Sequence, residues 1–427
     1  MTTAARAAAL QARAAKVAPA IALESRYGAH NYHPLPVVLN RGEGVFLFDE
    51  QGRRYLDMMS AYSAVSFGHS HPALVRALTE QAGRLAITSR AFHTDRLGPF
   101  LETLCRLTGM PRALPMNSGA EAVETAIKAA RKWAYKVKRV PDGLAQILVA
   151  EGNFAGRTTT IVGFSSESQY RDGFGPFAPG FAHVPFGDAK ALEAAITPHT
   201  AAFIVEPIQG EAGIVVPPAG YLKAVREICT RHNVLMICDE VQTGLGRTGR
   251  MLACDHEGVR PDGLTLGKAL GGGLLPVSAF LAREDVMAQF TPGDHGSTFG
   301  GNPLAAAVGQ AALELLEVEQ LARRAHDQGE YLMAQLGKLN HRAVIDIRGK
   351  GLLVGVEIDP DFASARTVCE ALMAEGVLSK DTHDTVVRLA PPLVIEREQI
   401  DFAVNGIDRV LRVLASKQTT SAEAATA

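Results

Sequence analysis

A lysine and an aspartate each follow a short apolar run between Val234 and Lys268. Asp239 ends the run VLMICD, and Lys268 follows GLTLG. A short apolar run bounded by turn signals is typical of a buried parallel strand, and ligands of open α/β sheets collect beyond the carboxyl ends of such strands. We therefore expect Asp239 and Lys268 to share one crevice. A lysine there suits Schiff-base formation with a carbonyl cofactor and an aspartate suits a pyridinium nitrogen, so the pair indicates pyridoxal phosphate.

Each of these residues also has an ordinary structural interpretation. Most lysines at strand ends are solvated surface charges. Asp239 taken alone fits the cap of a loop. The rest of the chain must therefore supply the other parts of a cofactor site.

The loop after Glu240 offers a competing interpretation. Gly244, Gly246 and Gly249 match the pattern GxGxxG directly after an expected strand, which is typical of a dinucleotide-binding site in a dehydrogenase. That fingerprint requires a helix that begins at the glycines. The following residues, RTGRMLACDHEGVRPDG, contain no long amphipathic helix and include Pro261. The dinucleotide interpretation is therefore disfavoured.

A second candidate site lies at the start of an alanine-rich helix in MNSGAEAVETAIKAARKWAYKVK. Ser118 and Gly119 open this helix, with Glu121 and Glu124 in its first turns and basic residues beyond, an order that suits the helix dipole. The free backbone N–H groups of a helix start form an anion site. Simple N-capping by Asn117 or Ser118 is the alternative.

Composition limits the classes of protein to consider. A length of 427 residues predicts about two or three domains. The formal net charge of −2 gives no general basic face for nucleic acid. No apolar run approaches the roughly 20 residues that span a bilayer. The five cysteines are dispersed, which indicates a reducing compartment, and the HxH of His69 and His71 has no further ligands at zinc-like spacing, so no metal site is expected.

The order of elements predicts an α/β fold. After a small β-meander before Asp57 and two helices, apolar runs alternate with helices such as YLKAVREICTRHN, which favours a mostly parallel sheet covered on both faces. The pattern changes to α+β around residues 318–345. The runs are QILVAEGNF, TTTIVGFSS, AAFIVEPIQGEAG, VLMICDE, GLTLGK and VSAFLA.

Taken together, these segments resemble the class III aminotransferases, pyridoxal-phosphate enzymes of fold type I. The resemblance runs from about Tyr27 to Ile395 and follows the family's order of motifs: GHSHP, NSGAEAVETAIK, EPIQGEAG, DEVQTGLGRTG, LGKALGGGLLPVSA and GSTFGGNPLA. It implies a large domain with a mostly parallel seven-stranded sheet and a small α+β domain built from the terminal segments. We expect a leader at 1–20, small-domain segments at 21–75 and 321–415, a large domain at 76–320 and a mobile tail at 416–427.

The resemblance also implies roles around the cofactor. Lys268 would form the Schiff base and move the proton, and Asp239 would keep the pyridine nitrogen protonated. The remaining cofactor-binding residues would be Ser118, Gly119 and Ala120 at the phosphate, Phe154 and Val241 on the two ring faces, Gln242 at the phenolic oxygen, and Ser297 and Thr298. Thr298 would come from the neighbouring subunit, which implies a homodimer or a larger homo-oligomer. Core packing is the alternative for Phe154 and Val241.

Within the family, the likeness is greatest to enzymes that transfer the δ-amino group of ornithine to 2-oxoglutarate, a reaction of proline and arginine metabolism. The segments YGAHNYHPLPVVL and SAYSAVSFGHSHP carry this likeness. The implied substrate-binding residues are Tyr27, Tyr62, Arg157, Glu211 and Arg388. Glu211 would pair with Arg388 while ornithine reacts and swing away when 2-oxoglutarate binds. An acetylornithine or 4-aminobutyrate aminotransferase is the alternative, and an inactive relative that acts as an interaction protein is a second one.

The first twenty residues leave the compartment open. They contain Arg6, Arg13 and Lys16 and no acidic residue. This pattern resembles a mitochondrial transit peptide without the usual serines. An alanine-rich leader of a cytoplasmic protein is the preferred interpretation, with the mitochondrial matrix as the alternative.

Overall fold

The structure is a computed structural model that describes the backbone of residues 19–426 and the side chains of residues 19–418. Most of the leader expected at residues 1–20 therefore lies outside the described residues. Its last two residues begin helix α2 (Pro19–Tyr27), which buries none of its side chains.

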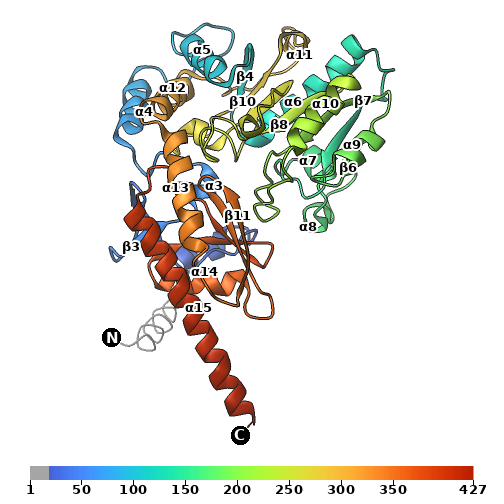
Figure 1. Cartoon of the computed structure of the whole chain (residues 1–427). Helices are drawn as coiled ribbons and strands as arrows, with labels where there is room; N and C mark the ends of the chain where they lie inside the picture. Colours follow the sequence, from blue (N-terminus) through green and yellow to red (C-terminus); the bar gives the residue numbers. More distant parts are fainter. Residues whose placement is uncertain (1–18, 427) are drawn as a thin grey trace.

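Seven strands form the largest sheet, in the order β4-β10-β9-β8-β7-β5-β6 (Figure 1). Strand β10 is antiparallel to its neighbours β4 and β9, and the other pairs are parallel. The predicted α/β class with a mostly parallel seven-stranded sheet is confirmed. The strands are β4 (Arg112–Met116), β5 (Gln146–Ala150), β6 (Phe181–Val184), β7 (Thr200–Val205), β8 (Leu235–Asp239), β9 (Gly263–Leu266) and β10 (Ser278–Ala282).

Apolar side chains cover both faces of this sheet, because successive residues of a strand point to opposite faces. In β8, Leu235 and Ile237 pack in the cluster that contains helix α6, while Met236 and Cys238 pack with α10 and α12. This explains the uninterrupted apolar runs. The helices around the sheet are α4 (Pro72–Arg84), α5 (Leu97–Thr108), α6 (Gly119–Trp133), α7 (Thr159–Gly163), α8 (Ser168–Arg171), α9 (Ala189–Ala195), α10 (Tyr221–Arg231), α11 (Glu284–Met287) and α12 (Pro303–Val318).

A segment from the N-terminal part of the described chain and one from its C-terminal part meet in a smaller part of the molecule. Strand β3 pairs in parallel with β13, at Leu56↔Val377 and Asp57↔Leu378, so the N-terminal meander and the C-terminal part share the sheet β1-β2-β3-β13. A second, antiparallel sheet has the order β11-β12-β15-β14. The residue boundaries predicted between the two parts stay a prediction. The elements are α3 (Ser60–Ser63), β1 (Leu39–Glu43), β2 (Phe46–Asp49), β3 (Arg54–Asp57), α13 (Leu321–Leu336), β11 (Val344–Lys350), β12 (Leu353–Ile358), α14 (Ala365–Ala374), β13 (Val377–Leu378), β14 (Lys380–Thr382), β15 (Val386–Leu389) and α15 (Arg397–Thr426).

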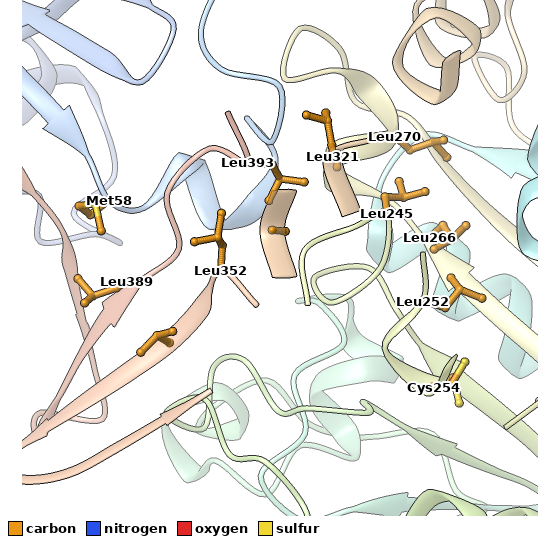
Figure 2. Close-up of a cluster of buried hydrophobic side chains, with 14 of the residues drawn as sticks. Met58, Leu245, Leu252, Cys254, Leu266, Leu270, Leu321, Leu352, Leu389 and Leu393 are labelled. Carbon is orange, nitrogen blue, oxygen red and sulfur yellow. The ribbon is translucent and has the colours of Figure 1, made fainter. Parts of the chain in front are cut away.

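The glycine loop after β8 lies between the two parts. Figure 2 shows Leu245 beside Leu266 and Leu270, with Leu352 and Leu393 on its other side, and all five belong to one buried cluster. A short 3-10 helix (Ala253–Glu257) follows the loop, not the long helix of a dinucleotide fold. The GxGxxG pattern is therefore a packing motif: Gly249 has a φ of 92°, and a Cβ on it would lie 3.1 Å from the Cα of His326 in α13.

One sequence-based expectation about an element is wrong. The run TTTIVGFSS, taken for a strand, forms helix α7, because the Thr158 hydroxyl accepts a hydrogen bond from the Ile161 N–H and caps it. Helix α15 continues through the tail at 416–427 as far as Thr426, since these residues include neither glycine nor proline to end a helix, and the mobility expected of this tail stays a prediction. None of the described helices is both long and apolar enough to cross a membrane.

Candidate active site

Asp239 and Lys268 lie at the same edge of the large sheet. Strands β8 and β9 are adjacent and parallel, their register pairs Asp239 with Thr265, and Lys268 follows the end of β9. Lys268 has a φ of 44°, a left-handed conformation that costs a non-glycine residue roughly 1–2 kcal/mol. Backbone strain of this kind persists where the surrounding structure holds it and is concentrated at functional sites.

The Asp239 carboxylate is buried and held in one orientation. Its Oδ1 accepts hydrogen bonds from Thr265 Oγ1 at 2.9 Å and from the Val241 N–H at 3.1 Å. Burial raises the pKa of Asp239, and these two bonds oppose that shift. Within residues 19–426 both donors reach Oδ1, so Oδ2 is the oxygen available to a cationic N–H from a ligand.

The surroundings of the Lys268 amine favour its neutral form. Burial lowers its pKa to about 8, although the charges of Glu211, Asp239 and Glu206 act in the opposite direction. A lysine with a pKa near neutrality has a substantial fraction of neutral amine at physiological pH. Lys268 therefore combines nucleophilic character with the ability to accept and return a proton.

The start of α6 lies beside these strand ends. Ser118 Oγ accepts from the Glu121 N–H at 3.2 Å, and Glu121 Oε2 accepts from the Ser118 N–H at 2.8 Å, which is the N-capping that the sequence left as an alternative. The first N–H groups of a helix have no partner inside it. The capping box uses those of Ser118 and Glu121, so the N–H groups of Gly119 and Ala120 are the donors left for an anion.

Val241 connects this helix start to the lysine loop. A Cβ on Gly119 would lie 2.9 Å from Val241 Cγ1, and a Cβ on Gly267 would lie 3.3 Å from the same atom. Only residues without a side chain allow the three segments to approach so closely. The structure therefore brings Val241, Gly119 and the residue before Lys268 together.

Phe154 is held by a carboxyl group that the sequence analysis did not single out. The Phe154 N–H donates to Glu206 Oε2 at 3.0 Å, and the Gly210 N–H donates to Glu206 Oε1 at 3.3 Å. Burial, reinforced by Asp239, raises the pKa of Glu206 to about 8. Glu206 thus joins the Phe154 loop to the segment that carries Glu211.

Arg388 and Glu211 form a bidentate ion pair. Arg388 Nη1 donates to Glu211 Oε1 at 2.8 Å and Nη2 donates to Oε2 at 2.9 Å. The Arg388 side chain is 1% exposed and the Glu211 side chain 23%. Burial acts to raise the pKa of Glu211, but the hydrogen bonds and charge of Arg388 outweigh it and lower the pKa to about 2. The acid is therefore ionised at neutral pH.

The backbone around Glu211 is fixed by residues of the smaller part. Thr382 Oγ1 donates to the Glu211 carbonyl at 2.6 Å, and Arg348 Nη2 donates to the Gly213 carbonyl at 2.8 Å. Gln242 Nε2 contacts Glu211 Oε1 at 3.3 Å. Any movement of Glu211 away from Arg388 is therefore a rotation of its side chain.

Tyr62 and Arg157 lie near this group. The Arg388 guanidinium is 5.1 Å from the centre of the Tyr62 ring. Arg157 stacks on Tyr170 at 3.7 Å and lies 5.5 Å from the Phe154 ring centre. None of the described carboxylates pairs with Arg157, so its guanidinium is available to an anionic ligand.

Other predicted residues stand apart from this group in the single chain. Tyr27 is 74% exposed at the end of α2, where the Arg26 guanidinium lies 5.1 Å from its ring. Thr298 is exposed. Ser297 accepts a hydrogen bond from Asn117 Nδ2 at 2.7 Å and so lies next to the start of α6.

Sequence reasoning missed three residues that hold the site: Glu206, Thr265 and Thr382. Glu206 stands in EPIQGEAG beside Glu211, and its place directly after an apolar run was the available signal. Thr265 and Thr382 carry no such signal, because a threonine in a strand is most often a packing residue.

Comparisons with known proteins identify the family of this chain. The family model for aminotransferase class-III matches residues 27–411. An ornithine aminotransferase of Halalkalibacterium halodurans is 56% identical over 91% of this chain and 96% of its own. The structure of the ornithine aminotransferase from Toxoplasma gondii, with partial occupancy of pyridoxal phosphate at its active site, superposes with a TM-score of 0.93 at 43% identity, covering 98% of this chain and 99% of that one. An acetylornithine aminotransferase from Elizabethkingia anophelis is 52% identical, with a TM-score of 0.85 over 92% of this chain and 98% of its own. The family resemblance drawn from the motifs, with its fold type I, is thus confirmed, and the chain belongs to the class III aminotransferases.

Proposed function

We propose that this chain moves the δ-amino group of L-ornithine to 2-oxoglutarate and yields glutamate 5-semialdehyde and glutamate. The observation that carries the proposal is the buried pair of Arg388 and Glu211. A bidentate arginine suits a carboxylate of 2-oxoglutarate. The δ end of ornithine has no carboxylate, so an uncovered Arg388 would remain a buried, unpaired charge beside it. Glu211 supplies the missing partner for that half of the reaction.

Pyridoxal phosphate fits the groups that the site leaves available. The N–H groups of Gly119 and Ala120 suit the phosphate. Asp239 Oδ2 suits the pyridinium N–H. Gln242 donates one N–H to Glu211 and has a second for the phenolic oxygen, since an amide nitrogen carries two. When bound, the cofactor supplies a ring that accepts the electron pair left behind when the carbon bearing the amine loses its proton.

The protein residues then divide the work. Lys268 Nζ takes the proton from the substrate carbon that bears the amine. It then delivers this proton to the carbon on the other side of the transferred nitrogen. Asp239 holds positive charge on the ring nitrogen, while Phe154 and Val241 confine the ring from its two sides. Arg157 binds the α-carboxylate of ornithine, and Tyr27 hydrogen-bonds its distal end.

A homodimer supports this site. Two neighbouring segments expose apolar side chains. The Leu304 N–H of one segment donates to the Ala86 carbonyl of the other at 3.3 Å. Phe92 is 67% exposed and Phe299 is 56% exposed. A partner chain would cover them and bring its own Thr298 to the phosphate. A monomeric mass for the cofactor-loaded enzyme in sedimentation equilibrium would contradict this arrangement.

The cysteines support a reducing compartment, and we place the enzyme in the cytoplasm. All five are free thiols, and Cys229, Cys238, Cys254 and Cys369 are buried. Disulfides are rare where thiols are kept reduced. Recovery of the protein in an organelle fraction after cell fractionation would favour the mitochondrial alternative.

The donor decides between this function and an acetylornithine aminotransferase, which the 52% identical structure favours as second candidate. The Arg388–Glu211 pair suits any donor that reacts at a terminal amine. Contacts with the distal end of the donor must therefore distinguish ornithine from N-acetylornithine. Ornithine, N-acetylornithine, 4-aminobutyrate and lysine, each supplied with 2-oxoglutarate, should give glutamate fastest with ornithine. Preference for the acetylated donor would overturn the assignment.

The replacement Gly119→Ala should weaken binding of the cofactor about tenfold, because its Cβ would meet Val241 Cγ1 at 2.9 Å and push the helix start away from the phosphate. Spectrophotometric titration of the cofactor-free enzyme with pyridoxal phosphate measures this. Gly83→Ala is the matched control, since a Cβ at that helical glycine has nothing within 4 Å. Equal affinities for the two variants would show that Gly119 does not shape the phosphate site.

A further inference from the structure

Arg247, in the glycine loop between the two parts of the molecule, is a fully buried charge with no acidic partner. Nη1 donates to the carbonyls of Leu352 at 2.9 Å and Pro391 at 2.5 Å, and Nη2 donates to Ser60 Oγ and Ser66 Oγ, each at 3.1 Å. The ion pairs of the described residues do not include it, and its Nε has no hydrogen-bond partner. Burial lowers the pKa of Arg247 to about 9, so the group is still cationic at neutral pH. Burial of a charge costs free energy, so we expect a buried arginine without an acidic partner to have a specific role.

Ser60 is the first residue of a left-handed turn, and Ser66 follows shortly after its end. Ser60, Ala61, Tyr62 and Ser63 have φ angles of 43°, 47°, 59° and 75°, and none is glycine. L-residues adopt this conformation singly and seldom in succession. Further hydrogen bonds brace the turn: the Ser60 N–H donates to Asp57 Oδ1, Ser60 Oγ donates to the Ala390 carbonyl, and Ser66 Oγ donates to the Ser63 carbonyl.

The turn carries Tyr62 to Arg388, whose guanidinium lies 5.1 Å from the ring centre. A right-handed or extended conformation at these residues would point the Tyr62 side chain elsewhere, since it reverses the sign of φ. Arg247 itself is firmly placed, because the Leu352 N–H donates to its carbonyl at 3.1 Å and its neighbour Leu245 lies in the buried cluster of Figure 2.

We propose that Arg247 is a positioning residue: it holds the left-handed turn Ser60–Ser63 in place and thereby fixes Tyr62 beside Arg388 in the donor pocket. The inference rests on the proposed function for the identity of the donor. It gives the GLGRTG loop a role in substrate binding through its arginine, in addition to the packing role of its glycines.

The test compares cofactor-loaded wild type with Arg247→Gln. The variant should raise KM for ornithine about tenfold while kcat changes much less, because the reacting groups at Lys268 stay in place. Amide hydrogen exchange of residues 59–66 should become faster. If Arg247→Gln folds and both KM and exchange stay as in wild type, the proposal is overturned.

A rescue experiment separates this role from general stabilisation. Ala61→Gly, added to Arg247→Gln, should restore much of the ornithine KM, because glycine adopts positive φ at little cost. Gln320→Gly is the matched control: Gln320 also has a positive φ, of 49°, but lies outside the turn. The control should raise Tm without restoring KM. Equal restoration of KM by both glycines would mean that Arg247 acts only through stability.

Ser66→Ala keeps the test decisive if Arg247→Gln does not fold, since it removes one acceptor of Arg247 and the bond to the Ser63 carbonyl. We expect faster exchange of residues 59–66 and a KM for ornithine raised about threefold; no change in either would overturn the proposal. The exchange measurement needs no substrate. Failure of wild type to use ornithine would therefore refute the proposed function alone.

Discussion

Replacement of Lys268 by alanine should lower kcat for transamination at least about 10⁴-fold, the upper range for loss of a general acid–base group. The same amine also links the cofactor covalently in our proposal. Both roles depend on one atom, Nζ, so no neighbouring group replaces it. The charged groups that act on the Lys268 amine are Glu211, Asp239 and Glu206, which are acids, and Arg388, an arginine that stays protonated.

The covalent link gives a readout that is independent of turnover. Borohydride reduction of the cofactor-loaded enzyme followed by peptide mass spectrometry should place the cofactor on the peptide that contains Lys268. The label should be absent in Lys268→Ala and unchanged in Lys136→Ala, a control at an exposed lysine. Turnover by Lys268→Ala close to that of wild type, or a label on another lysine, would contradict the assignment.

The pH dependence of loading follows from the lowered pKa of Lys268. Burial favours the neutral amine, so the reactive fraction rises as pH increases through about 8 and falls below it. The rate at which the cofactor-free enzyme takes up pyridoxal phosphate should rise over the same interval.

The sequence predicted the parts of this site that lie at ends of regular elements. Asp239 and Lys268 were placed together because the carboxyl ends of adjacent parallel strands meet at one edge, and the pairing of β8 with β9 has that geometry. The start of α6 was predicted for a similar reason, since a capping serine and an acid in the first turn mark a helix N-terminus.

The parts that sequence reasoning missed depend on contacts between distant segments. From the sequence alone, an arginine in a glycine-rich loop is expected at the surface. In the structure, Arg247 is held by the carbonyls of Leu352 and Pro391, which are distant in the chain. The left-handed turn at Ser60 contains no glycine, so the sequence does not indicate it. Helix α7 was mistaken for a strand because a five-residue element is too short for the helical period to show.

The second large effect concerns the choice between donor and acceptor. In Glu211→Ala, Arg388 loses its bidentate partner and stays buried as an unpaired charge, a change that costs about 3–5 kcal/mol. We expect kcat/KM for ornithine to fall about 10²-fold or more, because the δ end of ornithine cannot compensate that charge. Glutamate, whose carboxylate can pair with Arg388, should become the better donor in the reverse direction. Single-turnover rates with each amino donor measure the ratio directly.

Two features of the structure make this prediction specific to the Glu211 side chain. Thr382 and Arg348 hold the backbone at Glu211 and Gly213, so removal of the side chain leaves the loop in place. The surface pair of Arg106 and Glu317 has the same bidentate geometry, at 2.8 and 2.6 Å, with both side chains partly exposed. Glu317→Ala therefore removes an equivalent ion pair away from the site and should leave the preference for donors unchanged, because exposed pairs contribute little.

The pKa of Glu211, lowered to about 2, adds a condition on pH. A carboxyl group with a depressed pKa keeps its pairing above its ordinary pKa and loses it only as pH falls toward 2. Selection between ornithine and glutamate should therefore not change between about pH 6 and 9 through titration of Glu211. If Glu211→Ala leaves the preference for δ- over α-amino donors as it is in wild type, Glu211 does not shield Arg388 during the ornithine half-reaction, and the side-chain rotation proposed here has no part in substrate selection.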